Sequence, residues 1–289
     1  MHHMWLSSHV YILELLAKWN LRSCKPTNTP FPSKIAKLSL ALSNSLPDIS
    51  DVDLTQKYQQ IVGCLLYLAI STWPDILYYA MWLGQHNSKP MRAHFLAAKH
   101  VLRYLSGTAS LALQFGSPSA LLPDTMAGYM QNVRCSDVGW LGFRCCRSKK
   151  YLRLFILFEG SLVSWSATKQ KSIALSSTEA EYYTMSYAFK EALWLCVFLG
   201  LLRFPVPRPF PILSDNQVAC SLSNSPAISA RSKHTDIRHH FIHAHVQDGS
   251  FSTIWIPTTD MPANIFMKTL PFSVFSRHHD VLGLSTPAT

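Results

Sequence analysis

The sequence predicts an α/β protein in which a mainly helical region precedes a mixed sheet with helices packed on it. Residues 1–116 carry apolar residues at helical spacing, whereas residues 151–256 alternate short apolar runs typical of strands with helical segments. Hydrophobic residues make up 48% of the 289 residues and charged residues only 15%. This composition suits a packed core and excludes wholesale disorder, which requires low hydrophobicity and many charges.

The first region is predicted to consist of helices and a polar linker. A helix is expected over His9–Leu21, and the linker over Lys25–Asp53 is rich in Pro, Ser, Thr and Asn. Helical spacing resumes over Thr55–Trp82 and is broken at Pro74. A further helix is expected from Ser88-Lys89-Pro90 to Gly107, since Ser and Pro are typical of a helix start.

The second region, which follows a turn-like boundary over residues 117–130, is predicted to form the sheet. Three β-type runs are followed by a long helix, an apolar strand, two helices, a strand and a short helix. In order, these are Tyr151–Phe158, Leu162–Trp165, Ile173–Leu175, Thr178–Leu202, Phe210–Leu213, Gln217–Ser223, His234–Val246, Ser252–Ile256 and Pro262–Thr269. This order of elements predicts a mixed sheet covered by helices.

Charge, hydropathy and cysteine usage restrict the partner and the environment. The chain has 26 Lys and Arg against 16 Asp and Glu, a net charge of +10, which favours nucleic acid over a membrane surface. A basic but inert surface is the alternative. The longest strongly apolar stretch, Ala192–Leu202, is too short to span a bilayer, and no signal peptide is expected. Seven cysteines without a CxxC pair indicate reduced thiols, so we expect an intracellular protein that makes no membrane contact.

Three carboxylates lie beside apolar segments and are candidates for a metal site: Asp137, Glu181 and Asp215. Carboxylates that converge at a sheet edge repel one another unless cations neutralise them, and Mg²⁺ prefers oxygen ligands. Two such ions could clamp the attacking and leaving oxygens of a phosphodiester. A second interpretation stays open. Thr178-x-x-Glu181 and Ser176-x-x-Glu179 both fit a helix capping box, and the two Asp residues fit ordinary turn or cap positions.

A histidine-rich segment is the second candidate site. Histidines occupy positions 234, 239, 240, 243 and 245, and Arg231, Lys233 and Arg238 lie in the same stretch. Zinc needs three or four converging ligands, and no cysteine pair lies nearby. A basic helix that faces phosphates is therefore favoured over a zinc site, and a plain solvated helix face remains open.

Several motifs resemble the Pol polyproteins of copia-type retrotransposons, over residues 8 to 284. Three segments resemble the end of the reverse transcriptase region: Tyr58–Ala69, Trp73-Pro-Asp-Ile76 and Ala93–Thr108. Four others resemble the RNase H domain: Ser161–Tyr182, Lys190–Leu195, Ser214-Asp-Asn-Gln217 and Lys233–Ile242. The most specific match is Ala-Leu-Ser-Ser-Thr-Glu-Ala-Glu-Tyr at residues 174–182.

The resemblance implies two domains, a helical C-terminal remnant of the reverse transcriptase region at residues 1–116 and an RNase H-like domain at 128–284. It implies Mg²⁺-dependent hydrolysis of the RNA strand of RNA–DNA hybrids at four acidic positions. The first three fall on Asp137, Glu181 and Asp215, which would hold the metal. The fourth, in a motif of the form Ala-Asp-Ile-Phe-Thr-Lys, is Asn264 here. An amide brings no charge, so we expect a weakened two-ion site.

The chain departs from the family pattern in other places. Gly139 stands where a second Asp is usual, and Ser148-Lys-Lys-Tyr151 replaces a Ser-Thr-Ser-Gly turn. The paired-Asp motif of the polymerase is absent, so no polymerase activity is expected, and the missing reverse transcriptase core is a candidate partner.

The basic residues of the second region are candidate contacts to the nucleic-acid backbone: Lys169, Lys171, Arg231, Lys233 and Arg238. Such contacts make binding salt-dependent and largely independent of sequence. Asn264 favours an alternative, a catalytically dead module that keeps only nucleic-acid binding. A third interpretation is a pseudogene product that does not fold stably.

Overall fold

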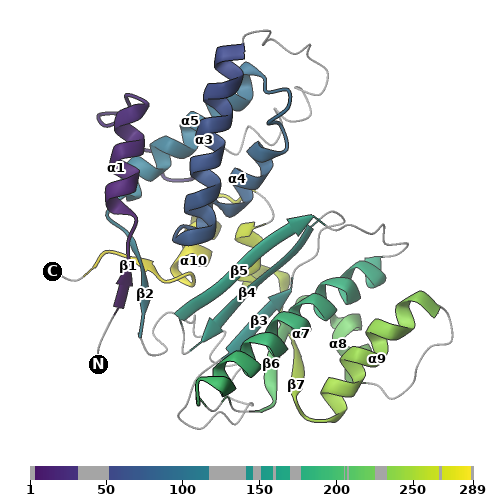
Figure 1. Ribbon diagram of the computed structural model, residues 1–289. Coiled ribbons are helices and arrows are strands. Elements are labelled where there is room, and N and C mark those ends of the chain that lie inside the picture. Colours follow the sequence, from purple (N-terminus) through teal and green to yellow (C-terminus); the bar gives the residue numbers. More distant parts are fainter. Residues whose placement is uncertain are drawn as a thin grey trace. The chain divides into compact units, whose positions relative to one another are not determined.

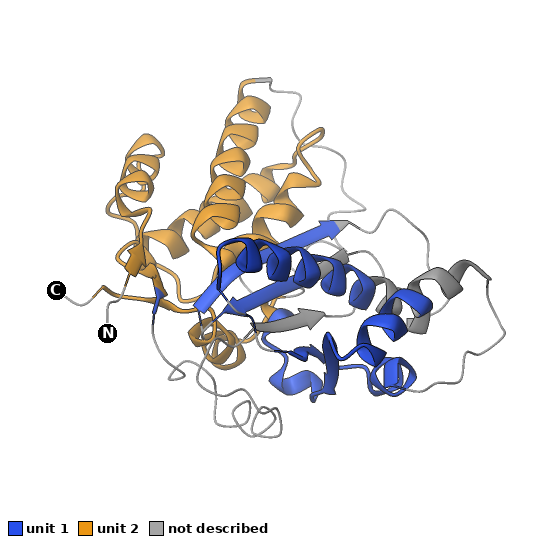
Figure 2. Ribbon diagram, turned by 60° about the horizontal axis from the view of Figure 1, so that its bottom comes forward, with its two compact units in different colours: residues 1, 115–264 blue, residues 2–114, 265–289 orange. Residues whose placement is uncertain are grey.

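Two sheets and the helices around them make up the part of the chain that the structure describes. The computed structural model describes residues 4–31, 52–116, 141–145, 151–158, 161–169, 177–204, 206, 208–224, 233–266 and 269–287. Within these residues, a three-stranded sheet has the order β1-β2-β8 and a five-stranded sheet the order β5-β4-β3-β6-β7. Two compact units result, one of residues 115–264 and one that joins residues 2–114 with 265–289 (Figure 2).

The helical unit is built mainly from the amphipathic helices that the spacing predicts. Its elements are β1 (Met4–Leu6), α1 (His9–Lys18), α3 (Val52–Ser71), η1 (Pro74–Ile76), α4 (Leu77–Gly84), α5 (Arg92–Thr108), β2 (Ala112–Phe115), α10 (Phe272–Asp280) and β8 (Leu284–Ser285). The break predicted at Pro74 is confirmed, because α3 ends at Ser71 and a short 3-10 helix begins at the proline. The α3 side chains at Ile61, Leu65 and Leu68 are fully buried, as one apolar helix face requires.

The last part of the chain packs with the helical unit. Strand β8 pairs antiparallel with β2, with Leu284 opposite Leu113, and the ring of Phe275 in α10 contacts that of Tyr104 in α5. The helical unit is therefore discontinuous in sequence. The predicted family domains, residues 1–116 and 128–284, stay a prediction, because packing of this segment does not define a family boundary.

The sheet unit confirms the predicted α/β class. Its elements are β3 (Leu141–Cys145), β4 (Tyr151–Phe158), β5 (Ser161–Lys169), α7 (Ser177–Leu201), β6 (Phe210–Ser214), α8 (Gln217–Asn224), α9 (Lys233–Gln247), β7 (Phe251–Trp255), η2 (Thr258–Asp260) and η3 (Pro262–Phe266). Strands β3, β4 and β5 pair antiparallel, whereas β6 lies parallel to β3 and β7. The parallel pairs need crossover connections, which α7, α8 and α9 supply (Figure 1).

The sequence did not predict β3, although Leu141, Phe143 and Cys145 alternate with other residue types as a strand requires. The predicted strand at Ile173–Leu175 lies outside the described residues. Helix α7 begins and ends within one residue of the prediction, Thr178–Leu202, because its helical spacing is long and uninterrupted.

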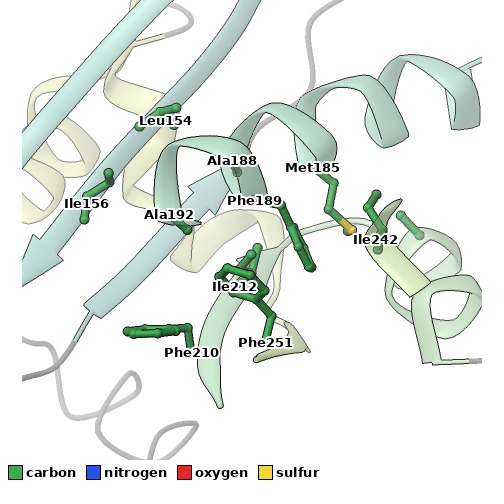
Figure 3. Close-up of a cluster of buried hydrophobic side chains, with 11 residues drawn as sticks. Leu154, Ile156, Met185, Ala188, Phe189, Ala192, Phe210, Ile212, Ile242 and Phe251 are labelled. Carbon is green, nitrogen blue, oxygen red and sulfur yellow. The ribbon is translucent and has the colours of Figure 1, made fainter. Parts of the chain in front are cut away.

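The core of the sheet unit holds α7 against the sheet. Met185, Ala188, Phe189 and Ala192 lie at the spacing of one helix face, and all four are fully buried (Figure 3). They pack with side chains from the strands and from α8 and α9: Leu154, Ile156, Phe210, Ile212, Ala219, Ile242 and Phe251. Each large side chain buried in this way contributes about 1.5–3 kcal/mol. The cluster therefore fixes α7, β4, β6 and β7 relative to one another within this unit.

Candidate active site

Asp215 directly follows the carboxyl end of β6, a strand that is buried along its whole length and lies between β3 and β7. The side chains of its two neighbours, Ser214 and Asn216, accept hydrogen bonds from nearby backbone N–H groups. The Asn216 backbone N–H donates to Ser214 Oγ (3.2 Å), and Asn216 Oδ1 caps α8 by accepting from the Ala219 N–H (3.0 Å). Because Asn216 is the capping residue, the carboxylate of Asp215 is not used as the helix cap. The half-buried side chain of Asp215 therefore stands at the strand end where the sequence predicted a site residue.

The segment that follows β7 folds back onto Asp215. Trp255 Nε1 donates to the Asp215 carbonyl oxygen, and Thr258 Oγ1 donates to Asp215 Oδ2, both at 3.3 Å. Asn264 Nδ2 donates to the Thr258 carbonyl oxygen at 2.7 Å. The structure thus joins two of the four predicted site residues, Asp215 and Asn264, through Thr258.

The other two predicted carboxylates are less completely described. Glu181 lies in α7, one helical turn before the buried Met185, but its side chain is outside the described residues. Helix α7 begins at Ser177, so Thr178 is already inside the helix, which disfavours the capping box that pairs it with Glu181. Asp137 lies outside the described residues. Cys145 of strand β3 lies opposite Ser214 of β6, and Ser214 is the residue that precedes Asp215 in the chain.

Comparisons with known proteins decide the family. No protein-family model matches the chain. It is 32% identical over 285 residues to the retrovirus-related Pol polyprotein from transposon TNT 1-94 of Nicotiana tabacum, covering 97% of this chain and 20% of that protein. It is 34% identical over 284 residues to the corresponding polyprotein from transposon RE1 of Arabidopsis thaliana, covering 97% and 18%. The chain belongs to the retrovirus-related Pol polyproteins of transposons.

This Pol chain spans about a fifth of the length of these relatives. The family predicted from the motifs is confirmed. A solved foamy viral protease-reverse transcriptase in complex with an RNA/DNA hybrid is 14% identical, with a TM-score of 0.38, over 71% of this chain and 25% of that chain. A likeness this distant has no bearing on the site.

Three of the five basic residues of the Pol chain that were predicted to contact nucleic acid lie in described elements, and none of the five has a described side chain. Lys169 ends β5, Lys233 begins α9 and Arg238 lies within α9, but their side chains are outside the described residues. Lys171 and Arg231 lie wholly outside them. Contacts from these residues to a nucleic-acid backbone stay a prediction.

The histidine-rich segment forms helix α9, as predicted. His243 is buried, His240 is exposed, and His245 Nδ1 lies 3.3 Å from Asp248 Oδ2. Where the structure describes side chains, no group of three or more His, Cys, Asp and Glu residues could hold a metal ion. This finding gives no support to a zinc site in α9. It does not test the predicted carboxylate site, because the side chains of Asp137 and Glu181 are outside the described residues.

Neither Trp255 nor Thr258, which both donate hydrogen bonds to Asp215, was predicted from the sequence as a site residue. A signal was present, because Pro257 and then the polar residues Thr258, Thr259 and Asp260 follow the strand that was predicted to end at Ile256. No described helix is both long enough and apolar enough to cross a bilayer.

Proposed function

We propose that this region of a retrotransposon Pol polyprotein is an RNase H-like domain that hydrolyses the RNA strand of RNA–DNA hybrids with Mg²⁺. The observation that carries the proposal is the position of Asp215. It stands at the carboxyl end of a buried parallel strand, within a mixed sheet flanked by helices, and is linked through Thr258 to Asn264. The membership of the chain in the Pol family supports the same activity.

The donors available at this site suit a hard cation. Asp215 offers carboxylate oxygens, and Asp137 and Glu181 would offer the same chemistry if they join it. Asn264 has committed its amide nitrogen to Thr258, so only its Oδ1 oxygen could face a cation. Bound Mg²⁺ would stabilise charge on the attacking and leaving oxygens of the phosphodiester. The protein's own contribution is orientation, since Thr258 Oγ1 donates to Asp215 Oδ2.

The substrate side of the proposal follows from charge. The chain carries a net charge of +10, and Lys169, Lys171, Arg231, Lys233 and Arg238 are the proposed contacts to phosphates. Binding would weaken steeply as salt rises, because phosphate contacts release counterions. Discrimination of the RNA strand would depend on contacts to the 2′-hydroxyl groups.

A second candidate function is nucleic-acid binding without catalysis. Asn264 favours it, because this position brings an amide where the family motif has a carboxylate, and that amide donates a hydrogen bond inside the protein. Under this alternative the fold and the basic residues are retained and cleavage is lost.

Cleavage of an end-labelled RNA–DNA hybrid in Mg²⁺ separates the two candidates. If the domain is a nuclease, the rate of cleavage should fall about 100-fold or more in Asp215→Asn and in Asp137→Asn, because each change removes a charged metal ligand. Asp248→Asn is the matched control, since this exposed carboxylate lies in the turn after α9, and its cleavage rate should equal that of the unaltered chain. Salt-sensitive binding without cleavage in the unaltered chain identifies the second candidate, and absence of both activities contradicts both.

A further inference from the structure

The segment after β7 holds Asp215 by contacts of unequal strength. Two exposed side-chain hydrogen bonds reach Asp215, one from Trp255 Nε1 at the end of β7 and one from Thr258 Oγ1 in the segment that follows, and both are 3.3 Å long. That length is beyond the usual range, about 2.7–3.2 Å for N–H···O and 2.5–3.0 Å for O–H···O, so both bonds are weak. The segment is also joined to β6 by the Ile256 backbone N–H, which donates to the Ser214 carbonyl oxygen at 2.9 Å. The bond from Asn264 Nδ2 to the Thr258 carbonyl oxygen is 2.7 Å long. The shortest bond in this chain of contacts is therefore the one that Asn264 makes.

Asn264 is itself rigidly placed. It is only 4% exposed, and its neighbours Ala263 and Ile265 are fully buried. Its backbone N–H donates to the Met261 carbonyl oxygen at 3.1 Å. The backbone and both neighbours thus restrict the side chain to the position from which it reaches Thr258.

The chemistry of this contact requires a donor at residue 264. A carbonyl oxygen only accepts hydrogen bonds, so the atom that faces the Thr258 carbonyl has to be the amide nitrogen. An ionised aspartate has acceptor oxygens only. Placed here, it would set a negative oxygen against the Thr258 carbonyl oxygen and leave that carbonyl without this bond.

We propose that Asn264 is a positioning residue, whose amide donates to Thr258 and thereby holds the Thr258 hydroxyl against Asp215. The role of Asp215 in metal binding rests on the proposed function, but the contact itself does not. On this view Asn264 is more than a weakened replacement for a carboxylate ligand. It has become part of the scaffold, and restoring the family's aspartate by Asn264→Asp damages the site.

If Asn264 is only a weakened metal ligand, the opposite effect of Asn264→Asp is expected. Asn264→Asp would then add a fourth carboxylate, tighten Mg²⁺ binding and leave the segment after β7 undisturbed. Asn264→Ala separates the two effects further, because it removes the donor without adding a charge.

The test uses the full chain and two measurements that need no cleavage. The first is the melting temperature with and without Mg²⁺. The second is the ¹H–¹⁵N signal of the Trp255 indole, assigned through Trp255→Phe, which reports the contact to Asp215. Asn264→Asp is expected to lower the melting temperature by about 3–8 °C, from the loss of a buried hydrogen bond, and to shift the indole signal. Asn264→Ala should lower the melting temperature less and shift the same signal.

Changes at Thr258 keep the inference testable if Asn264→Asp fails to fold. Thr258→Val retains the carbonyl oxygen that Asn264 contacts but removes the hydroxyl, so it should shift the indole signal with a melting temperature within about 2 °C of the unaltered chain. Thr258→Ser keeps the hydroxyl and is the matched control, expected to change neither. The inference is overturned if Asn264→Asp in Mg²⁺ is at least as stable as the unaltered chain and its Trp255 indole signal does not move. It is also overturned if the indole signal does not move in Thr258→Val.

The outcome does not depend on whether the domain is an active nuclease. If the melting temperature and the indole signal change as expected but the chain cleaves no hybrid, the positioning role is upheld and the proposed function is rejected. Cleavage that rises in Asn264→Asp would uphold the function and reject the positioning role.

Discussion

The two units treat a carboxylate in opposite ways. Asp75, in the helical unit, is fully buried; the Tyr104 hydroxyl donates to it, and His279 Nε2 lies 3.7 Å from its Oδ2. Asp215, in the sheet unit, is half-buried at the end of a strand and receives a long hydrogen bond from Thr258. The difference teaches that a fully buried carboxylate depends on donors from its own unit, whereas one that follows a strand keeps part of its surface exposed to solvent.

The surroundings of Asp75 show what it does for the helical unit. Burial raises the pKa of this carboxyl, and nearby His279 and the Tyr104 hydrogen bond offset part of that rise. Burial also raises the pKa of Tyr104 well above its ordinary value, as does the adjacent Asp75. These three residues come from η1, α5 and α10, so the cluster connects the first part of the chain with its last part within one unit.

Removal of residues 265–289 is expected to have the largest effect, and it would act on the helical unit. This segment supplies β8 and α10, and its Phe275, Val281, Leu282 and Leu284 side chains are buried. At about 1.5–3 kcal/mol for each, their loss is comparable with the stability of a whole domain, about 5–15 kcal/mol. We expect the truncated chain to lose a cooperative transition in calorimetry. Removal of residues 287–289 alone is the control, and equal melting of both truncations would contradict the discontinuous unit.

Asp75→Ala should come next, with a loss of about 2 kcal/mol in the free energy of unfolding. The change leaves the buried Tyr104 hydroxyl without its acceptor. Urea denaturation measures the loss, and Asp215→Ala, which removes the acceptor of the exposed Thr258 hydrogen bond, should stay within about 1 kcal/mol of the unaltered chain. Equal losses for the two alanine variants would erase the contrast between the two carboxylates.

Asp75→Asn gives the comparison a pH dependence. A folded-state pKa above the ordinary value means that the stability due to this group is fully present at low pH and is lost as pH rises through the folded pKa. The unaltered chain should therefore lose stability relative to Asp75→Asn as pH rises above the ordinary pKa of an aspartate, about 3.9, and Asp215→Asn serves as the comparison in the other unit. Parallel stability curves for the unaltered chain and Asp75→Asn would contradict the raised pKa.

A smaller effect is expected from acid at the start of α5. His94 Nδ1 accepts from the Met91 backbone N–H at 3.0 Å, and the His94 and His86 rings stack with centroids 3.9 Å apart. Burial, and then His86, lowers the pKa of His94 to about 4. A depressed folded pKa makes stability fall as pH drops from 6.5 towards 4, by about 1–2 kcal/mol after allowance for solvent screening. His94→Gln should flatten this part of the stability curve measured by urea denaturation, whereas His240→Gln, at an exposed position, should not.

The smallest effect is expected at an exposed ion pair of the helical unit. Lys57 and Asp53 are four residues apart on α3 and pair at the surface. Lys57→Met should lower the free energy of unfolding by about 0.3–0.5 kcal/mol in low salt, and about 0.5 M salt should abolish the difference. A loss as large as that of Asp75→Ala would show that burial is not what separates strong from weak polar contacts here.

Local patterns predicted the elements whose reasons are local. Pro74 ended a helix because it lacks an N–H, and the helical pattern over Thr178–Leu202 located α7 to within one residue at each end. The polar residues after β6 marked Asp215 as a site candidate before its surroundings were known. Strand β3 was missed because its five residues are too few to carry more than a weak alternation.

The sequence by itself determined the family, the α/β class and the residue types from which a metal and nucleic-acid site could be built. The tertiary structure decided which residues meet. It joined β8 to β2, placed His279 beside Asp75, and linked the Asn264 amide through Thr258 to Asp215. The physical reason is that periodicity and turn chemistry report on neighbours within one element. A hydrogen bond between segments depends on how packing closes the chain, and at Asn264 that closure brings the amide nitrogen within hydrogen-bond distance of the Thr258 carbonyl oxygen.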